Sequence, residues 1–275
     1  MHAAGPRADI RPLLARLWAD YTAQNPQAAQ IRRLLEERGE AVVDDHIALR
    51  TFADPRVGID VLARPFVDAG YARGDDYTFA DKGLRARHYD PPTDDLPRLF
   101  VSELLLGPGT PCSAWSLATL RGLLDAIDAG RLDAAPLAAL GRPWPALAWD
   151  TYERLRGESE YAAWLAAFGF RANHFTVAVH ALRTLAGVAE VNALVEAAGI
   201  PLLRAGGVIK GGPADRLEQS STLAAPTVVD FADGPRTIPG CYYEFARRYP
   251  GPDGRLFGGF VPRSADRIFE STDRR

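Results

Sequence analysis

Apolar residues near the start of the chain recur at helical spacing. Asp9 is a helix-capping residue type, and it precedes such a pattern over about residues 12–24. Pro26 suits the first turn of a second helix, whose leucines keep helical spacing until Gly39. The pattern therefore predicts an N-terminal helical hairpin over residues 10–39.

A mixed module follows over about residues 42–106. Residues 41–52 approach the alternation of a strand, and residues 57–70 have a helical pattern that stops at a glycine. Two more strand-like runs, at 84–90 and 96–106, are separated by the turn-forming sequence PPTDD. This order indicates one compact unit.

Residues 107–168 are rich in Ala, Leu and Trp and contain several prolines, which predicts a helical insert. The order of the first module then recurs over about residues 171–263. The sequence thus predicts an α+β fold, one domain built on two similar modules. In the second module we expect strands at 171–182, 217–231 and 240–249, and a helix at 188–199 closed by Gly199.

The two modules share chemically distinctive positions. Each opens with a polar residue followed by histidine at the start of a strand, as Asp45-His46 and as Asn173-His174. Each also has a glutamate in its last central strand, Glu103 in FVSELL and Glu244 in CYYEFA. The repeat predicts that the two histidines and two glutamates occupy equivalent positions around one shared cavity.

Composition narrows the function classes. The chain has 275 residues, of which 47% are hydrophobic and 24% charged, as in ordinary globular proteins. The net charge of −3 with no basic block argues against a nucleic-acid partner. No apolar run is long enough for a membrane helix, and the start lacks the apolar core of a signal peptide, so we expect a cytoplasmic protein with no membrane partner. Cys112 and Cys241 are expected to be buried free thiols.

His46, His174 and Glu244 form the candidate metal set. Two imidazoles and one carboxylate on one face of a metal leave positions open for a substrate and dioxygen, which suits Fe²⁺. Ligands on distant strands have no short motif, and each residue taken alone has a structural interpretation as well. Histidines within apolar strands need partners, however, and their equivalent positions in the two modules favour a shared site.

The other acidic and histidine candidates are weaker. His180 lies six residues beyond His174, roughly 20 Å along an extended strand, so both cannot bind one metal. His88 lies among charged residues and is a lesser candidate, and His2 falls in an expected frayed terminus. Glu103 has three interpretations: a fourth ligand, a hydrogen-bond partner of a ligand imidazole, or a buried carboxylate satisfied by an arginine.

Arg50 lies four residues beyond His46 on the same strand face, about 13 Å along. Its planar guanidinium suits a distal substrate carboxylate, and the alternative is a surface ion pair. Lys210 lies in a glycine-rich loop that is either a closing segment or a simple turn. The neutral donors near this loop are Gln219, Ser220, Ser221 and Thr222.

Five segments together resemble one known family, the 2-oxoadipate dioxygenase/decarboxylases, also called hydroxyglutarate synthases. They are DDHIALRTF, NHFTV, LEQSST, IPGCYYEFARR and GFVPRSADRIFEST, and the resemblance runs from about Val42 to Thr272. It implies a relationship to the vicinal oxygen chelate fold, in which paired βαβββ modules form a cupped mixed sheet around a metal. It also places the metal ligands at His46, His174 and Glu244, and the substrate-binding arginine at Arg50.

The resemblance implies Fe²⁺-dependent conversion of 2-oxoadipate and dioxygen to 2-hydroxyglutarate and carbon dioxide. The partners would be a small 2-oxo dicarboxylic acid and dioxygen. Two alternatives stay open: another enzyme of this architecture, such as a glyoxalase-like isomerase or ring-cleaving dioxygenase, and a non-enzymatic binding module. Glu103 discriminates among the enzymes, because a fourth protein ligand would favour isomerase chemistry. Oligomeric state does not follow from the sequence.

Overall fold

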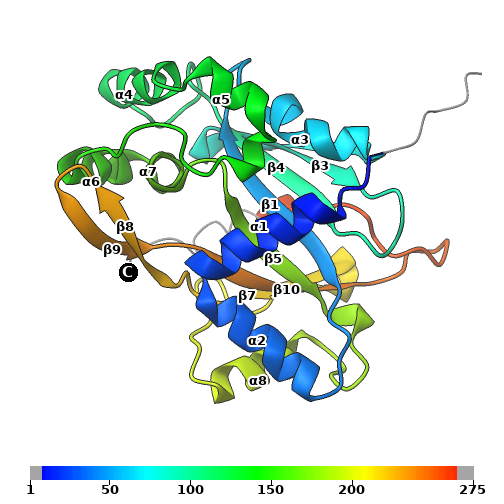
Figure 1. Cartoon of the computed structure of the whole chain (residues 1–275). Helices are drawn as coiled ribbons and strands as arrows, with labels where there is room; N and C mark the ends of the chain where they lie inside the picture. The colour runs from blue at the N-terminus through cyan, green and yellow to red at the C-terminus, as the bar shows by residue number, and fades with distance from the viewer. Residues whose placement is uncertain (1–7, 265–275) are drawn as a thin grey trace, which may run out of the picture.

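An eight-stranded mixed sheet runs through the molecule in the order β2-β3-β4-β1-β5-β10-β7-β6, and β8 pairs with β9 in a separate sheet (Figure 1). The computed structural model describes residues 8–264, apart from the side chains at 133 and 134. His2 and residues 265–272 of the last resembling segment lie outside the described residues.

The first module is built from β1, α3, β2, β3 and β4. The sequence pattern missed β2, because its ARGDDYTF sequence is mostly polar and only Tyr77 and Phe79 are buried. β2 lies at the edge of the sheet, where hydrogen bonding to β3 holds a strand whose side chains largely face solvent. The element bounds are β1 Asp44–Phe52, α3 Ile59–Asp68, β2 Ala72–Phe79, β3 Leu84–Asp90 and β4 Arg98–Leu104.

The second module repeats this order with a hairpin added before its last strand. The single strand expected over 217–231 is wrong: the chain leaves the main sheet after Ser221 and enters the separate hairpin at Pro226. That hairpin packs against the helical insert, where Phe231 contacts Trp149 edge-on. The bounds are β5 Ala172–Ala178, α8 Val188–Ala197, β6 Lys210–Gly212, β7 Leu217–Ser221, β8 Pro226–Phe231, β9 Gly234–Pro239 and β10 Tyr242–Arg248.

The modules meet at an antiparallel pairing of β1 with β5. In its register His46 lies opposite Thr176, and Ala48 lies opposite His174. On the outer sides of this seam, β4 runs parallel to β1 and β10 runs parallel to β5. The seam therefore brings the two predicted histidines onto neighbouring strands, as the repeat in the sequence required.

Helices cover the sheet and leave one face for the site. The N-terminal hairpin crosses β5 in Figure 1, and Trp18 and Tyr21 contact Phe175 with ring centroids 5.1 and 5.0 Å apart. Successive strand residues point to opposite faces, so His174 points away from this hairpin. The N-cap of the first helix of the hairpin is Ile10 rather than Asp9, although the Asp9 carboxylate accepts a hydrogen bond from the Arg11 N–H at 3.1 Å.

The remaining helices lie where the sequence predicts the insert and the hairpin. α7 is buried along its whole length, so the insert contributes to the core. The helices are α1 Arg11–Gln24, α2 Pro26–Glu37, α4 Ala114–Asp125, α5 Ala129–Ala134, α6 Trp149–Glu158 and α7 Glu160–Phe168, with short 3-10 turns η1 Ala80–Lys82, η2 Leu137–Ala139, η3 Val179–Ala181 and η4 Pro213–Asp215.

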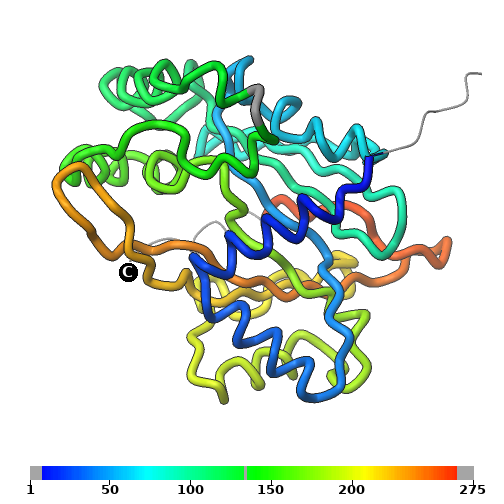
Figure 2. The backbone as a smooth tube through the Cα atoms, in the orientation of Figure 1, coloured from blue at the N-terminus to red at the C-terminus, as the bar shows by residue number. Residues whose placement is uncertain are grey.

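The chain after β10 returns toward the first module, where the red end of the tube lies beside the cyan strands (Figure 2). Phe260 fixes this return, because its N–H donates to the Tyr77 hydroxyl at 3.1 Å. Cys112 and Cys241 are buried free thiols, as predicted.

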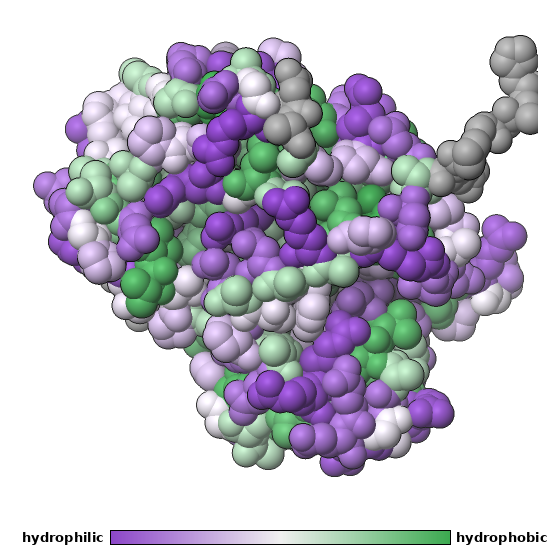
Figure 3. Space-filling view, viewed as in Figure 1, coloured by the Kyte–Doolittle hydropathy of each residue, from purple (hydrophilic) through white to green (hydrophobic). Residues whose placement is uncertain are grey.

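The molecular surface mixes polar and apolar side chains over the face shown in Figure 3. Across residues 8–264, we find no helix with the length and apolar character needed to span a membrane.

Candidate metal centre

His46, His174 and Glu244 come together inside the cupped sheet, and all three are buried. They come from β1, β5 and β10, and one potential ligand atom of each lies within 4.8 Å of the others. The two Nε2 atoms are 3.4 Å apart, and the nearest Glu244 oxygens lie 3.7 Å from His46 Nε2 and 3.3 Å from His174 Nε2. The structure thus brings together the three residues that the sequence singled out.

Each histidine is oriented by the residue that precedes it. The Asp45 carboxylate lies 2.7 Å from His46 Nδ1, and the Asn173 amide oxygen lies 3.2 Å from His174 Nδ1. An acceptor at Nδ1 places the ring proton there and leaves Nε2 with its lone pair toward the centre. Burial, assisted by the charges of His46 and Arg50, holds the pKa of His174 well below its usual value, so this imidazole is neutral.

Asp45 is itself held by a second buried residue. Arg248 donates to both of its oxygens, through Nε at 2.7 Å and through Nη2 at 2.9 Å. Burial acts to raise the pKa of Asp45, but the Arg248 charge and the His46 hydrogen bond outweigh it and hold this pKa far below its usual range. Asp45 is therefore an anion that anchors His46.

Glu244 supplies the carboxylate of the group. Burial raises its pKa, although the His46 charge and a hydrogen bond donated by Gln219 act in the opposite direction. A buried carboxylate beside two inward-facing imidazole nitrogens is a donor set that fits a divalent transition metal, whose charge would compensate the desolvation of Glu244. The residues present therefore fit the metal predicted from the sequence.

Arg50 lines the same cavity from β1, farther along the strand. Its side chain is 2% exposed, so the surface ion pair considered from sequence is wrong. The guanidinium carbon lies 4.9 Å from the ring centroids of both Tyr161 and Trp164, which come from α7. The Tyr161 hydroxyl is held in turn by the Ser102 carbonyl at 2.8 Å. The helical insert thus fixes the direction of Arg50.

The cavity enclosed by these groups measures about 20 Å³. Among the buried polar atoms in its wall, Asn173 Nδ2 and Gln219 Oε1 have no hydrogen-bond partner among residues 8–264 and are available to a ligand. Tyr242 stacks on His174 with ring centroids 4.6 Å apart, and Phe260 meets His46 edge-on at 4.8 Å. The lining residues are His46, Ala48, Arg50, Phe100, Ser102, Asn173, His174, Gln219, Tyr242, Glu244 and Phe260.

Glu103 does not share this cavity, so its predicted equivalence to Glu244 is wrong. Its carboxylate accepts hydrogen bonds from Arg85 Nη2 at 2.6 Å and from the Ile59 N–H at 3.1 Å. Of the three roles considered from the sequence, Glu103 therefore has the role of a buried carboxylate satisfied by an arginine. On β4 it is Phe100 and Ser102 that line the metal cavity, and Glu103 points to the opposite face.

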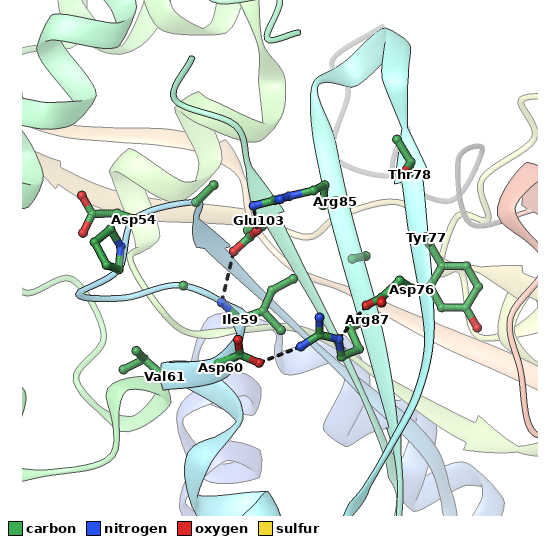
Figure 4. Close-up of a pocket in the computed structure, with 14 residues that line it drawn as sticks. Asp54, Ile59, Asp60, Val61, Asp76, Tyr77, Thr78, Arg85, Arg87 and Glu103 are labelled. Atoms are coloured by element: carbon green, nitrogen blue, oxygen red, sulfur yellow. Dashed lines mark hydrogen bonds and ion pairs between the residues drawn. The ribbon is translucent and has the colours of Figure 1, made fainter. Parts of the chain in front are cut away.

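Glu103 lines a separate and larger cavity of about 550 Å³ between α3 and the β2–β3 strands (Figure 4). Its charged groups are largely matched within the protein. Arg87 bridges Asp60 and Asp76, each at 2.6 Å, while Asp54 pairs with Arg56. This cavity lacks the two candidate ligand histidines, and its size alone does not make it the reactive centre.

The other sequence candidates have structural roles. His88 Nδ1 lies 2.8 Å from the Tyr77 hydroxyl, and His180 accepts a hydrogen bond from the Arg248 N–H at 3.3 Å. His180 lies in η3, because the strand expected over 171–182 ends at Ala178. Lys210 donates to the Gly207 carbonyl at 2.7 Å and so holds its own loop together. Of the neutral donors Gln219, Ser220, Ser221 and Thr222, only Gln219 lines the metal cavity.

Sequence reasoning overlooked Arg248, Tyr161, Trp164, Tyr242 and Phe260. Arg248 had a usable signal, because it is a charged residue four positions beyond Glu244 on the same face of the strand. The aromatic residues had none, since aromatic side chains in apolar segments are usual core residues.

Comparisons with known proteins identify the family to which the sequence is similar. Residues 9–113 and 117–257 match the family described as 2-oxoadipate dioxygenase/decarboxylase. The chloroplastic 2-oxoadipate dioxygenase/decarboxylase of Arabidopsis thaliana is 35% identical, over 96% of this chain and 77% of the relative.

Solved structures of similar proteins have the same fold. The hydroxyglutarate synthase of Oryza sativa, solved with 2-oxoadipate, has a TM-score of 0.89 and 32% identity, over 99% of this chain and 98% of that one. A Shewanella frigidimarina protein described provisionally as a hydrolase has a TM-score of 0.87 and 43% identity, covering 94% and 100% of the two chains. A Ralstonia eutropha protein described provisionally as a glyoxalase superfamily member shares the fold, with a TM-score of 0.66 and 23% identity over 89% of this chain and 83% of that one.

Proposed function

The chain belongs to the 2-oxoadipate dioxygenase/decarboxylase family, and we propose that it converts 2-oxoadipate and dioxygen to 2-hydroxyglutarate and carbon dioxide. The observation that carries this proposal is the convergence of His46, His174 and Glu244 with Arg50 in one buried cavity. The substrate is its own reductant in this reaction, so no second 2-oxo acid is consumed.

In this proposal His46 Nε2, His174 Nε2 and a Glu244 oxygen hold Fe²⁺. Bound iron supplies the site for the carboxylate and keto oxygens of the substrate and the redox chemistry of dioxygen. The Nδ1 atoms of the two imidazoles face Asp45 and Asn173, which directs each Nε2 atom toward the metal position. Gln219 fixes Glu244 by donating to its carboxylate.

Arg50 binds the far carboxylate of the substrate and thereby sets its direction in the cavity. A planar guanidinium donates two parallel hydrogen bonds to a carboxylate, and the rings of Tyr161 and Trp164 keep that plane from turning. Asn173 Nδ2 and Gln219 Oε1 are additional polar contacts for the substrate. Phe100, Tyr242 and Phe260 exclude water around the reacting end.

Phe100 also favours oxygenase chemistry over a glyoxalase-like isomerase. On β4 the cavity is lined by this apolar ring and by Ser102, with no carboxylate or imidazole to act as a fourth ligand, so positions on the metal would stay open to substrate and dioxygen. A cytoplasmic location remains a prediction, since the Arabidopsis relative is named as chloroplastic.

The test is oxygen uptake by protein loaded anaerobically with Fe²⁺, comparing 2-oxoadipate, 2-oxoglutarate and no substrate. We expect one dioxygen consumed, one carbon dioxide released and one 2-hydroxyglutarate formed for each 2-oxoadipate. Zn²⁺-loaded protein is the matched control, because zinc fills the same donor set without redox chemistry. Metal binding without oxygen uptake would contradict the proposal and favour isomerase, hydrolase or binding functions.

A further inference from the structure

Arg248 lies at the junction of the metal centre and the segment that covers it. We infer that Arg248 is a positioning residue: through Asp45 it holds His46 in its ligating orientation, and through residues 257–259 it seats Phe260 against the same imidazole. This inference rests on the proposed metal centre.

The guanidinium of Arg248 has partners on both sides. Its Nε and Nη2 atoms bind the two Asp45 oxygens, at 2.7 and 2.9 Å. Its Nη1 atom donates to the carbonyls of Phe257 at 2.7 Å and Gly259 at 2.8 Å. The side chain is 0% exposed, so water does not compete for these bonds. The buried guanidinium therefore joins β1 to residues 257–259, two segments that have no strand pairing with each other.

The contacts of Arg248 with Asp45 determine the orientation of His46. Asp45 Oδ1 lies 2.7 Å from His46 Nδ1 and is also the oxygen that Arg248 Nη2 holds. A carboxylate fixed at both oxygens has no freedom to rotate away from the imidazole. An arginine-anchored carboxylate behind a ligand histidine fixes the ring proton and ring plane, which raises metal affinity.

The contacts of Arg248 with the carbonyls at 257 and 259 hold the segment 257–260, which covers the cavity. Phe260 is the one cavity-lining residue in the described chain that lies outside the strands of the sheet. Its ring packs on the Arg248 guanidinium at 5.1 Å and contacts His46 at 4.8 Å and Phe100 at 4.9 Å. A cavity of about 20 Å³ holds about one water molecule, and Phe260 forms the part of its wall that no strand pairing holds in place.

These contacts couple the cover to the metal ligand through one residue. Loss of the Arg248 guanidinium frees Asp45 to turn and at the same time releases the backbone carbonyls at 257 and 259. A residue with only a packing role would affect overall stability and leave the metal-binding geometry intact. The two roles are therefore separable by measurement.

The experiment compares Arg248→Met, Arg248→Lys and Asp45→Asn in the full-length protein with Co²⁺ as the probe. Affinity and the visible absorption spectrum of bound Co²⁺ report the site, and hydrogen exchange of the backbone amides at 257–260 reports the cover. Glu103→Gln is the matched control, because it weakens another buried carboxylate–arginine pair, on β4, that faces away from the cavity. All variants are also compared by thermal midpoint.

We expect Arg248→Met to weaken Co²⁺ binding by about 10- to 100-fold, alter its spectrum and speed exchange at 257–260. Arg248→Lys should recover part of both effects, because an ammonium still reaches Asp45 or one carbonyl. Asp45→Asn should weaken Co²⁺ binding with a smaller change in exchange, which also covers the case in which Arg248→Met does not fold. Glu103→Gln should change neither readout, whatever its effect on the thermal midpoint.

Two outcomes would overturn the inference in different ways. If the wild-type protein binds Co²⁺ and the Arg248 and Asp45 variants bind it with unchanged affinity and spectrum, the positioning role is wrong and the metal centre stands. If the wild-type protein binds no Co²⁺, the proposed metal centre fails and the inference fails with it.

Discussion

Phe100 occupies in the first module the position that Glu244 occupies in the second. Two residues beyond His46, Ala48 lies beside Phe100 on the neighbouring parallel strand. Two residues beyond His174, Thr176 lies beside Glu244 in the same way. The repeat that duplicates the histidine therefore does not duplicate the carboxylate, and the candidate centre contains one carboxylate instead of two.

Phe100→Glu should restore the missing carboxylate and close the centre. With four protein ligands we expect tighter Co²⁺ binding, and we expect loss of oxygen uptake with 2-oxoadipate because fewer metal positions remain for substrate and dioxygen. Metal titration and an oxygen electrode measure the two effects.

Phe100→Leu is the control for that change, since it replaces the ring by a smaller apolar side chain that cannot bind a metal. It should keep metal affinity near the wild-type value and retain oxygen uptake. Unaltered oxygen uptake by Phe100→Glu would show that this position does not face the metal.

Glu244→Gln should reduce metal affinity by about 100-fold or more, because an amide lacks the negative charge that stabilises a bound divalent ion. Loss of a ligand should exceed the roughly 10- to 100-fold effect of losing a residue that only hydrogen-bonds to a ligand. The amide preserves the shape of the buried side chain, so the fold should be retained. Isothermal titration with Co²⁺ measures the loss, and circular dichroism checks the fold. Wild-type affinity in this variant would remove Glu244 from the ligand set.

Arg50→Met should lower kcat/KM for 2-oxoadipate by about 30-fold or more, as expected when a charged contact worth about 2 kcal/mol is lost. The same change should matter little for 2-oxohexanoate, which lacks the far carboxylate. Arg50→Lys should be intermediate, because an ammonium neither forms the two-pronged bond nor stacks between Tyr161 and Trp164 in the same way. Equal losses for both substrates would assign Arg50 a structural role instead.

Glu40 should make stability depend on acid pH. It accepts hydrogen bonds from the Thr184 hydroxyl at 2.6 Å and the Arg183 N–H at 2.8 Å, which hold its pKa below the usual 4.5. A depressed folded-state pKa stabilises the fold above the unfolded value, and this contribution is lost as pH falls through the folded value. The stability difference between wild type and Glu40→Gln should therefore be largest near neutral pH and shrink below pH 4.5.

Denaturant midpoints measured across that pH range give this difference. Glu37→Gln, at the end of the preceding helix α2, is the control, because Glu37 is exposed. A wild-type advantage over Glu40→Gln that stays constant down to strongly acid pH would contradict the assignment.

Local pattern was sufficient for the elements that bury apolar side chains. β1 and β5 were predicted because their β-branched and apolar residues fit a buried strand, and α8 ends before Gly199 with its left-handed φ of 77°. β2 was missed because an edge strand with polar side chains is stabilised by its neighbour rather than by burial.

By itself the sequence determined the two modules, the positions of His46, His174, Glu244 and Arg50, and the residue types that suit a metal. The tertiary structure alone decided which glutamate joins the two histidines, because strand register is a pairing of distant segments and an odd shift along a strand reverses the face: Glu103 lies three residues beyond Phe100. It alone decided that Arg248 holds Asp45, 203 residues away in sequence. Such contacts depend on how strands and returning segments pack, which no local periodicity encodes.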